Sequence, residues 1–347
     1  MNILSLGYYP FYDNNFDDKF TPARIIARHK ESYICHKGRE ELIAEISGKF
    51  RYDAVKTDDF PVVGDWVGIT THIDMAIIHF IMPRQSSLAR KAAGSSDSQL
   101  MLANINTAFI VQSCDRDFNL NRLDRYISIA HTGNVSPIVL LNKMDLIPEK
   151  ERNQNKEIIL KRHPSIPVHF TSFKNIQSIK IIESLMMPKK TYVFIGSSGV
   201  GKSTLINALF EDNLQETKSL SESTNKGKHT TTSRELFILD SGSIVIDTPG
   251  MRELGIIGDD DAINQTFSKI HLLEEKCRFS NCTHTNEPGC ALQQAIANKD
   301  ITTEDLKSFQ KLQREKIHYQ SSLLERRSKN KAFGKMVKSF KKQKETF

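Results

Sequence analysis

The 347-residue chain lacks the features of membrane-spanning and disulfide-stabilised proteins. No stretch of it approaches the ~20 consecutive apolar residues that a transmembrane helix needs. Residues 1–18 include no Lys or Arg, so this segment does not resemble a secretory signal. Five cysteines are too few for a disulfide framework in a chain of this length. We therefore expect a cytoplasmic protein with no membrane partner.

The composition is that of a folded protein with more than one domain. Hydrophobic residues make up 39% of the chain and charged residues 26%, which are ordinary values for globular proteins. At roughly 100–200 residues per domain, the length predicts two or three domains. No internal repeat is present, and no feature of the sequence demands more than a monomer.

Positive charge is concentrated at the C-terminal end. The net charge of the chain is +7, yet the segment from Lys311 to Phe347 alone holds twelve basic and three acidic residues. The rest of the chain is therefore slightly acidic. Such asymmetry is typical of proteins that bind a polyanion. A solvated helix face with a frayed end would give the same pattern, and charge alone does not separate the two interpretations.

The hydrophobic pattern divides the chain into three blocks. Short apolar runs between about residues 21 and 90 predict a small barrel or sandwich. An OB-type barrel would suit an RNA partner, although a barrel used only for packing fits the same residues. From about residue 105, strands alternate with helical segments, which predicts a parallel α/β sheet. After about residue 260 the pattern is helical, and Thr302 begins a long helix that runs into the basic tail.

One segment matches the phosphate-binding pattern G-x-x-x-x-G-K-[ST] in full. Its residues are Gly196, Ser197, Ser198, Gly199, Val200, Gly201, Lys202 and Ser203. It follows a predicted strand and opens a helix, where backbone N–H groups and the helix N-terminus can hold phosphates. We expect Lys202 to reach the β- and γ-phosphates, Ser203 to ligate Mg²⁺ and Thr204 to complete the nucleotide contacts. The alternative is a glycine-rich turn that binds nothing.

A second segment indicates that the nucleotide is GTP. It follows the predicted strand Pro137–Leu141 and fits the base-recognition pattern N-K-x-D with Asn142, Lys143, Met144 and Asp145. The Asp145 carboxylate can accept from guanine N1–H and from the exocyclic amine, whereas adenine offers no such donors. We expect Asn142 near the N7 side of the base and the Lys143 stem over the ring.

Two further segments fit elements of GTPases, although neither is informative alone. Thr171 and Ser172 follow a short predicted strand and fit the element that contacts the base through its backbone. The segment 247–250 reads D-T-P-G and fits D-x-x-G, a pattern that is also a common turn. In the GTPase interpretation, Asp247 holds Mg²⁺ through water and the Gly250 N–H senses the γ-phosphate. Three motifs after three strands together predict a GTP site.

The order of these motifs is unusual. N-K-M-D at residue 142 precedes the phosphate loop at 196, and D-T-P-G follows at 247, whereas ordinary GTPases begin with the phosphate loop. Because the cyclic order is retained, we expect a circularly permuted GTPase domain whose original termini are joined. The segment after D-T-P-G then leads directly into the C-terminal block, so the nucleotide state could move that block.

The polar segment 218–233 lies between the phosphate loop and D-T-P-G, the position of a switch that the γ-phosphate orders. Thr230 and Thr231 are both candidates for sensing Mg²⁺, and the sequence does not choose between them. Met251 stands where Ras-like GTPases have the glutamine that orients water. His229 is our candidate for positioning that water, with Lys202 and Thr230 completing the catalytic set. His229 could instead contact RNA or solvent.

The C-terminal block contains a metal-binding pattern formed by Cys277, Cys282, His284 and Cys290. Three thiolates and an imidazole select tetrahedral Zn²⁺, and four protein ligands leave no open position. We therefore expect one structural zinc ion. The alternative is a group of free buried cysteines beside an unrelated histidine.

Together these motifs resemble the ribosome small-subunit-dependent GTPase A family (RsgA, also called YjeQ or YloQ). The resemblance rests on the permuted order, on G-K-H-T-T-T at 227–232, on D-T-P-G-M-R-E-L at 247–254 and on the cysteine spacing with E-P-G-C at 287–290. It implies an RNA-binding OB-fold barrel over 1–92, a permuted P-loop GTPase domain over 93–258 and a zinc-binding helical domain with a basic tail over 259–347.

The resemblance also implies an activity and a partner. It implies GTP hydrolysis during late maturation of the 30S ribosomal subunit, stimulated by that subunit, with a catalytic role for His229. The implied partners are GTP or GDP and the 30S subunit with its 16S rRNA. The missing glutamine keeps an alternative open, namely an rRNA-binding assembly chaperone that GTP gates with little intrinsic catalysis. A permuted GTPase for the large subunit is a weaker alternative, because the barrel and the cysteine cluster argue against it.

Overall fold

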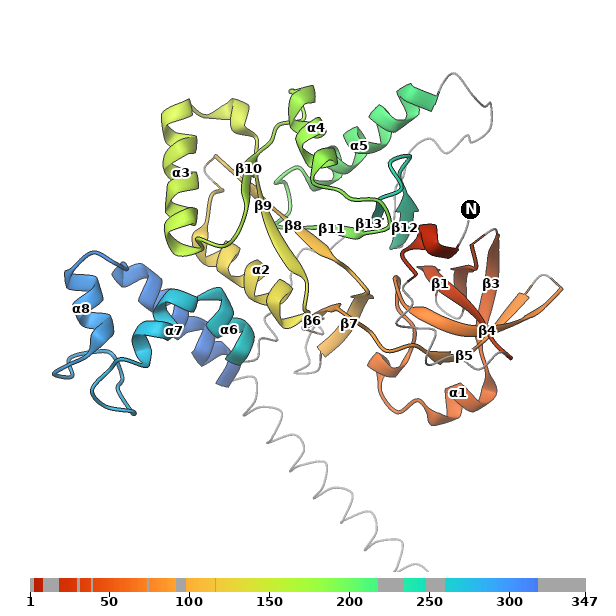
Figure 1. Ribbon diagram of the computed structural model, residues 1–347, viewed down its shortest axis with the longest axis horizontal. Coiled ribbons are helices and arrows are strands. Elements are labelled where there is room, and N and C mark those ends of the chain that lie inside the picture. The colour runs from red at the N-terminus through yellow and green to blue at the C-terminus, as the bar shows by residue number, and fades with distance from the viewer. Residues whose placement is uncertain are drawn as a thin grey trace, which may run out of the picture.

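The computed structural model describes residues 3–8, 19–29, 32–38, 40–73, 75–91, 98–115, 117–217, 234–247 and 260–317. These residues form an N-terminal barrel, a central α/β sheet and a C-terminal helical block (Figure 1). The three blocks predicted from the hydrophobic pattern are therefore all present. No helix within the described ranges is both long and apolar enough to cross a membrane.

Five strands close the N-terminal barrel. They are β1 (Thr21–Arg28), β2 (Tyr33–His36), β3 (Glu41–Ile46), β4 (Trp66–His72) and β5 (Met75–Ile81). Their order is β1-β2-β3-β5-β4, and β4 pairs back onto β1. The β3–β5 pair is parallel and the other pairs are antiparallel. The helix α1 (Gly48–Asp53) connects β3 to η3 (Thr57–Asp59) and β4. This closed five-stranded barrel confirms the expected OB-type fold.

The central sheet has the strand order β10-β9-β8-β11-β13-β12. Its strands are β8 (Thr107–Ser113), β9 (Ser136–Asn142), β10 (Val168–Phe170), β11 (Thr191–Ile195), β12 (Glu235–Ile238) and β13 (Ile244–Asp247). All neighbours are parallel except β12, which runs antiparallel to β13 and pairs on its other side with β1 of the barrel. The parallel sheet was expected, whereas β12 was not identified from the sequence. The phosphate-loop strand β11 is central although it comes late in the chain, as a permuted domain requires.

Helices cover both faces of this sheet, which explains its nearly continuous apolar strands. Leu123 of α2 (Leu120–Thr132) and Ile159 of α3 (Glu149–Arg162) pack on one face. Ile182 of α4 (Ile176–Ser184) and Leu205 of α5 (Lys202–Thr217) pack on the other face. The hairpin β6 (Ser87–Lys91) and β7 (Ser98–Ala103) precedes the sheet and spans the expected boundary at residue 92.

Arg24 joins the barrel to the central sheet. Its side chain is 1% exposed and donates to the Thr191 hydroxyl at 2.9 Å and to the Asn104 carbonyl at 3.1 Å. Thr191 is the first residue of β11, the strand that leads into the phosphate loop. The barrel is therefore fixed at the amino end of that strand, opposite to the end that carries the loop. The short helix η1 (Ile3–Leu6) packs here as well, because its Leu6 carbonyl accepts from Arg24 at 2.5 Å.

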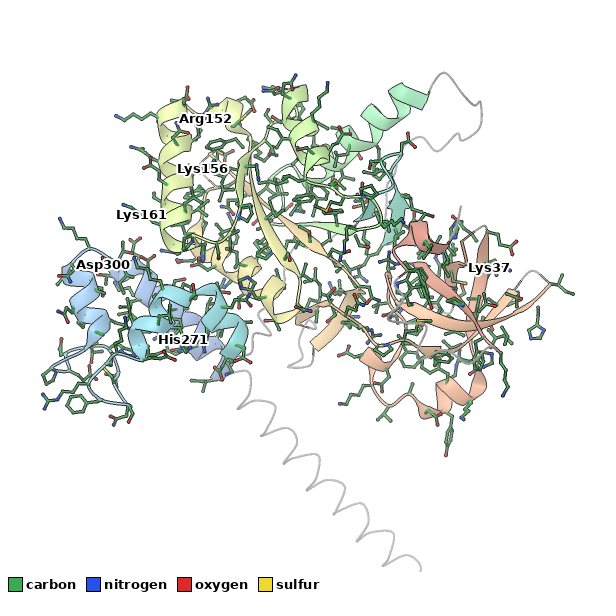
Figure 2. All side chains as sticks on the ribbon, in the orientation of Figure 1. Lys37, Arg152, Lys156, Lys161, His271 and Asp300 are labelled. Atoms are coloured by element: carbon green, nitrogen blue, oxygen red, sulfur yellow. The ribbon has the colours of Figure 1, made fainter. Side chains whose placement is uncertain are left out.

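The C-terminal block consists of α6 (Asp260–Thr266), α7 (Ser268–Glu274), α8 (Ala291–Ala297) and a helix over 303–317. Thr302 caps that helix, since its hydroxyl accepts from the Asp305 N–H at 3.1 Å while the Asp305 carboxylate accepts from the Thr302 N–H at 2.8 Å. The predicted helix start is thus confirmed. The block packs beside α2 and α3, and Figure 2 shows Lys161 of α3 close to Asp300, with which it lines a crevice.

Candidate functional site: a nucleotide site and a metal cluster

The predicted nucleotide motifs meet at one edge of the central sheet. The phosphate loop follows β11, N-K-M-D follows β9, Thr171 and Ser172 follow β10, and Asp247 ends β13. These four strands are parallel, so their carboxyl ends lie at the same edge. Ligands of open α/β sheets bind at this edge. The sequence motifs therefore form a single site.

Two glycines of the phosphate loop are required by their surroundings. Gly196 has φ +148°, and a Cβ there would lie 2.3 Å from the Val111 carbonyl oxygen. Gly201 has φ +99°, and a Cβ there would lie 2.3 Å from the Asn142 amide nitrogen. No side chain fits at either position without displacing a neighbour. The loop is thus packed tightly against the strands on which it stands.

The polar side chains of the loop surround the start of α5. Lys202 donates to the carbonyls of Gly196 at 2.8 Å and Ser197 at 2.5 Å, so its ammonium lies over the loop. Ser203 and Thr204 are exposed in the first turn of α5, where helix N–H groups favour an anion. Val200 is fully buried and anchors the loop in the core under α4 and α5.

Asn142 ties the base-recognition motif to the phosphate loop. Its amide is buried and donates to the Val200 carbonyl at 2.8 Å. Its carbonyl oxygen accepts from the Thr171 hydroxyl at 3.2 Å. The asparagine therefore connects the loops that follow β9, β10 and β11. This connecting role was not inferred from the sequence, because it depends on the contact between two loops 58 residues apart.

The Asp145 carboxylate is fixed in place by two neighbouring side chains. Its carboxylate accepts from the Ser172 hydroxyl at 2.6 Å and lies 3.1 Å from the Lys174 ammonium. The pKa of Asp145 is lowered, chiefly by the hydrogen bond from Ser172 and also by Lys174. Burial acts in the opposite direction, but its effect is smaller. The group is therefore ionised at neutral pH, as guanine recognition requires. Lys174 was missed in the sequence, which offers no local signal for this ion pair.

Lys143 and Met144 form the turn between β9 and α3. Lys143 has a left-handed backbone with φ +61°, and its ammonium lies 3.4 Å from the Asp115 carboxylate. The helix η4 (Met144–Leu146) follows directly and leads toward α3. Asp115 comes just after β8, so this ion pair joins the loops of two adjacent strands. Sequence reasoning did not identify Asp115.

Apart from Lys202, the catalytic candidates lie outside the described ranges, as do the switch candidates. His229, Thr230, Thr231, Gly250 and Met251 all lie outside them. Asp247 is described and lies opposite Glu235 in the β12–β13 pair. Its neighbours on the other side belong to β11, which brings Asp247 to the strand that carries the phosphate loop.

The four predicted metal ligands come together in the C-terminal block. The ligand atoms of Cys277, Cys282, His284 and Cys290 all lie within 4.8 Å of one another. The His284 Nδ1 atom is 3.6 Å from the Cys277 sulfur and 3.7 Å from the Cys290 sulfur, and these two sulfurs are 4.0 Å apart. Tetrahedral Zn–S and Zn–N bonds imply separations of about 3.6–3.8 Å. The cluster can therefore hold a metal ion of this size.

A carboxylate that sequence reasoning missed orients the histidine. Glu274 lies 2.9 Å from His284 Nε2, which directs Nδ1 toward the three sulfurs. Such a carboxylate on the far nitrogen of a ligating histidine is a common feature of metal sites. His284 itself has a left-handed backbone with φ +60°. The chain therefore turns after Cys282, which places the imidazole ring beside the sulfurs. Glu274 lies on α7, outside the spaced motif, which is why the pattern did not show it.

Among the cysteines, Cys290 has a distinct environment. Desolvation raises the pKa of its cluster neighbour Cys282 to about 11. Burial raises the pKa of Cys35 to about 11 and that of Cys114 to about 12, so both stay protonated thiols. At Cys290, burial acts in the same direction, but the backbone N–H of Gln293 and the His284 ring outweigh it and lower the pKa. The environment of Cys290 thus favours the thiolate that binds metals.

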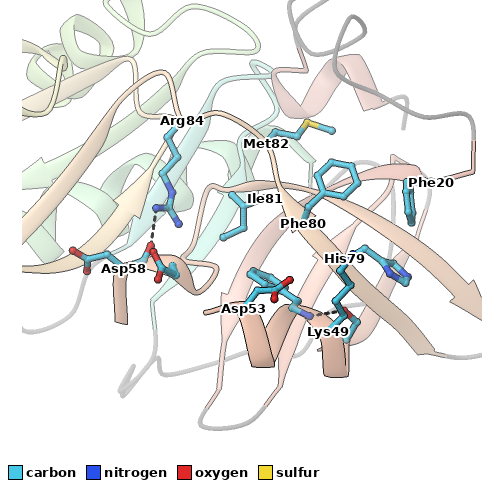
Figure 3. A pocket seen from close by; sticks show the side chains of 12 residues that line it. Phe20, Lys49, Asp53, Asp58, His79, Phe80, Ile81, Met82 and Arg84 are labelled. Atoms are coloured by element: carbon cyan, nitrogen blue, oxygen red, sulfur yellow. Dashed lines mark hydrogen bonds between the residues drawn. The ribbon is translucent and has the colours of Figure 1, made fainter. Parts of the chain in front are cut away.

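A groove of about 880 Å³ lies on the barrel, away from the nucleotide edge (Figure 3). Phe20 packs against His79 and Phe80 with ring centroids 4.9 and 5.2 Å apart, and Lys49 also lines the groove. Arg84 lines it too, although its guanidinium is held by two 2.8 Å hydrogen bonds to buried Asp65. The groove is therefore an aromatic surface with a fixed arginine.

Comparison with known proteins agrees with this geometry. A sequence model of the RsgA GTPase family matches residues 81–257. A small ribosomal subunit biogenesis GTPase RsgA 2 from Lactiplantibacillus plantarum is 42% identical over 316 residues, covering 90% of this chain and 88% of the relative. A protein from Opitutus terrae, named small ribosomal subunit biogenesis GTPase RsgA, is 36% identical over 334 residues, covering 92% and 90%.

Solved structures share the fold. The crystal structure of YloQ, a circularly permuted GTPase, has a TM-score of 0.63 and 25% identity, covering 87% of this chain and 96% of that one. The crystal structure of YjeQ from Thermotoga maritima has a TM-score of 0.65 and 24% identity, covering 86% and 99%. This chain thus shares its fold with both structures, one of which is that of a circularly permuted GTPase. The chain belongs to the RsgA GTPase family.

Proposed function

We propose that this protein is a GTP hydrolase that acts in late maturation of the small (30S) ribosomal subunit and is stimulated by that subunit. The observation that carries the proposal is the hydrogen bond from Asn142 to the Val200 carbonyl, which joins guanine recognition and phosphate binding in one site. The names of the relatives supply the ribosomal role. The chain acts as a cytoplasmic monomer that binds GTP or GDP.

The residues of the site divide into base, phosphate and metal contacts. Asp145, with Ser172 and Lys174 behind it, accepts from the guanine edge. Lys202 moves from the loop carbonyls to the β- and γ-phosphates, and Ser203 with Thr230 or Thr231 holds Mg²⁺. Mg²⁺ supplies charge neutralisation at the transferred phosphate. His229 positions the attacking water, since Met251 cannot.

The N-terminal barrel and the C-terminal block bind and position the subunit. The domain boundaries are 1–92 for the RNA-binding barrel, 93–258 for the GTPase domain and 259–347 for the metal-bearing block with its basic tail. The metal is one structural Zn²⁺ held by Cys277, Cys282, His284 and Cys290. The separations between these ligand atoms and the orienting carboxylate support that assignment. The partner surface is the 16S rRNA, which the tail contacts through phosphates.

The test is GTP turnover by the purified protein, alone and with saturating 30S subunits, at low and moderate salt. We expect strong stimulation that weakens as salt rises, because phosphate contacts release counterions. A Lys202→Ala variant is the control, and it should lose turnover under both conditions. Turnover that the subunit leaves unchanged would exclude the proposal.

A second function, that of an rRNA-binding assembly chaperone gated by GTP, is favoured by Met251 at the position of the missing glutamine. The two functions predict different results for one variant. If the Lys202→Ala variant still leaves the subunit at the normal rate, hydrolysis is not needed for release and the chaperone function is supported.

A further inference from the structure

The loop between the first two metal ligands presents an exposed aromatic and an arginine that lie against each other. Phe279 is 42% exposed, and the Arg278 guanidinium carbon lies over its ring, 5.5 Å from the centroid. The next two residues, Ser280 and Asn281, are exposed polar side chains. The ring is thus partly open to solvent, and the two residues that follow it in the chain give it no apolar cover.

The backbone of this loop is fixed at both ends. The Arg278 N–H donates to the Gly289 carbonyl at 3.1 Å, and the Cys282 N–H donates to the Phe279 carbonyl at 3.2 Å. Gly289 has φ +78°, and a Cβ there would lie 3.0 Å from the Arg278 Cβ, so the arginine stem packs on it. With Cys277 and Cys282 in the metal cluster, the loop can present Phe279 at little cost in ordering.

The exposed charges around the pair are two cations and one carboxylate. Lys276 and Arg278 are exposed. The nearby carboxylates face other groups: Glu274 contacts His284 at 2.9 Å, and Glu287 accepts from the Thr283 and Thr285 N–H groups at 2.8 and 2.9 Å. The exposed carboxylate is Glu275, whose side chain is 64% exposed and lies 3.8 Å from His271, which Figure 2 shows on the C-terminal block. The surface offered by the loop is an aromatic ring with two cations.

We propose that Phe279 is a stacking platform for an unpaired base of the RNA in the small ribosomal subunit, with Arg278 supporting the ring and contacting the adjacent phosphate. This inference rests on the proposed function. Unpaired bases are recognised by stacking on aromatic rings and on guanidinium planes, and both are present here on one rigid loop. A protein partner would instead require an apolar surround to bury the ring, and Ser280 and Asn281 do not supply one.

The test compares the binding of full-length, metal-loaded variants to 30S subunits in the presence of a non-hydrolysable GTP analogue. Stacking on an aromatic ring contributes about 1–3 kcal/mol per base, so Phe279→Ala should weaken binding about fivefold to 150-fold. Phe279→Trp should bind as tightly as the parent, and Phe279→Leu should be as weak as the alanine variant. Leu272→Ala, which removes a 59% exposed aliphatic side chain from the same block, is the matched control and should have no effect.

Two further readouts separate stacking from a structural role. GTP turnover by the free protein and the metal content should be unchanged in every variant, since Phe279 ligates no metal. In Phe279→Trp, the fluorescence of the new tryptophan should be quenched when subunits are added. The fluorescence of Trp66, which is 1% exposed, should stay constant.

Equal binding by the parent and Phe279→Ala would overturn the inference while leaving the proposed function intact. Equal binding by the leucine and tryptophan variants would show that the apolar area of the side chain, rather than base stacking, determines the affinity. That result would also overturn the inference. Failure of the parent protein itself to bind subunits would remove both proposals.

Discussion

The imidazole of His163 lies between Asp124 and Thr266, with Nε2 2.7 Å from the Asp124 carboxylate and Nδ1 3.0 Å from the Thr266 carbonyl. Asp124 belongs to α2, His163 ends α3 and Thr266 ends α6. The ring therefore joins the GTPase domain to the C-terminal block. The α3 helix that it follows begins just after N-K-M-D, so one helix connects the predicted base-recognition motif with that block.

Asp124 is the centre of this interface, and its replacement should be costly. The carboxylate is fully buried and accepts from Arg162 at 2.8 Å and from Ser308 at 2.7 Å, in addition to its His163 contact. Asp124→Asn leaves the buried Arg162 with Asp305 as its remaining carboxylate partner, so we expect a loss of about 3–5 kcal/mol in the free energy of unfolding. Denaturant unfolding measures this loss.

The control for Asp124 is the more exposed ion pair of the same interface, Arg125 with Glu315. Glu315 is 36% exposed, so Glu315→Gln should cost less than about 1 kcal/mol. Equal losses for the two substitutions would show that burial does not determine the strength of this interface.

Stability should fall in mild acid because of His131. Burial, reinforced by His163, lowers the pKa of His131 from 6.5 to about 4. The unfolded chain therefore binds a proton at pH values where the folded protein does not, and the contribution of this group declines as pH falls from about 6.5 to about 4. His131→Gln should flatten the dependence of the melting temperature on pH in this window. An unchanged slope would assign the acid sensitivity to other groups.

The packing of the phosphate loop on Asn142 should make Gly201 irreplaceable. Gly201→Ala combines a left-handed backbone with a Cβ that would lie 2.3 Å from the Asn142 amide nitrogen. Strain of about 1–3 kcal/mol should weaken GTP binding about fivefold to 150-fold, measured with a fluorescent GTP analogue. Gly48→Ala, where a Cβ would meet nothing within 4 Å, should bind GTP normally. Equal affinity in both variants would contradict the tight packing described here.

The orienting carboxylate should determine how firmly the metal is held. Glu274→Ala removes the contact on His284 Nε2, and the loss of such a partner typically weakens metal affinity about 10–100-fold. Release of zinc to a chromogenic chelator measures this. Glu275→Ala, which changes the next residue and leaves His284 untouched, is the matched control. If both variants release zinc at the parent rate, Glu274 has no role in the site.

Features that depend on local spacing could be predicted from the sequence alone. The glycines and Lys202 of the phosphate loop, N-K-M-D, the four metal ligands and the cap at Thr302 are readable because each motif is short and its chemistry demands particular residues. The permuted order was readable for the same reason, since it needs only the positions of the motifs along the chain.

Which of these features act together could be read only from the packed fold. The Asn142 link to Val200, Lys174 beside Asp145, Glu274 behind His284 and the buried charges around Asp124 each join segments that no local pattern relates. Barrel closure through β4 and β1 is decided in the same way, as is the pairing of β12 with β13 on one side and with the barrel strand β1 on the other. The physical reason is that burial and hydrogen bonding between distant segments depend on the packed fold, whereas motif chemistry depends on neighbours in the chain.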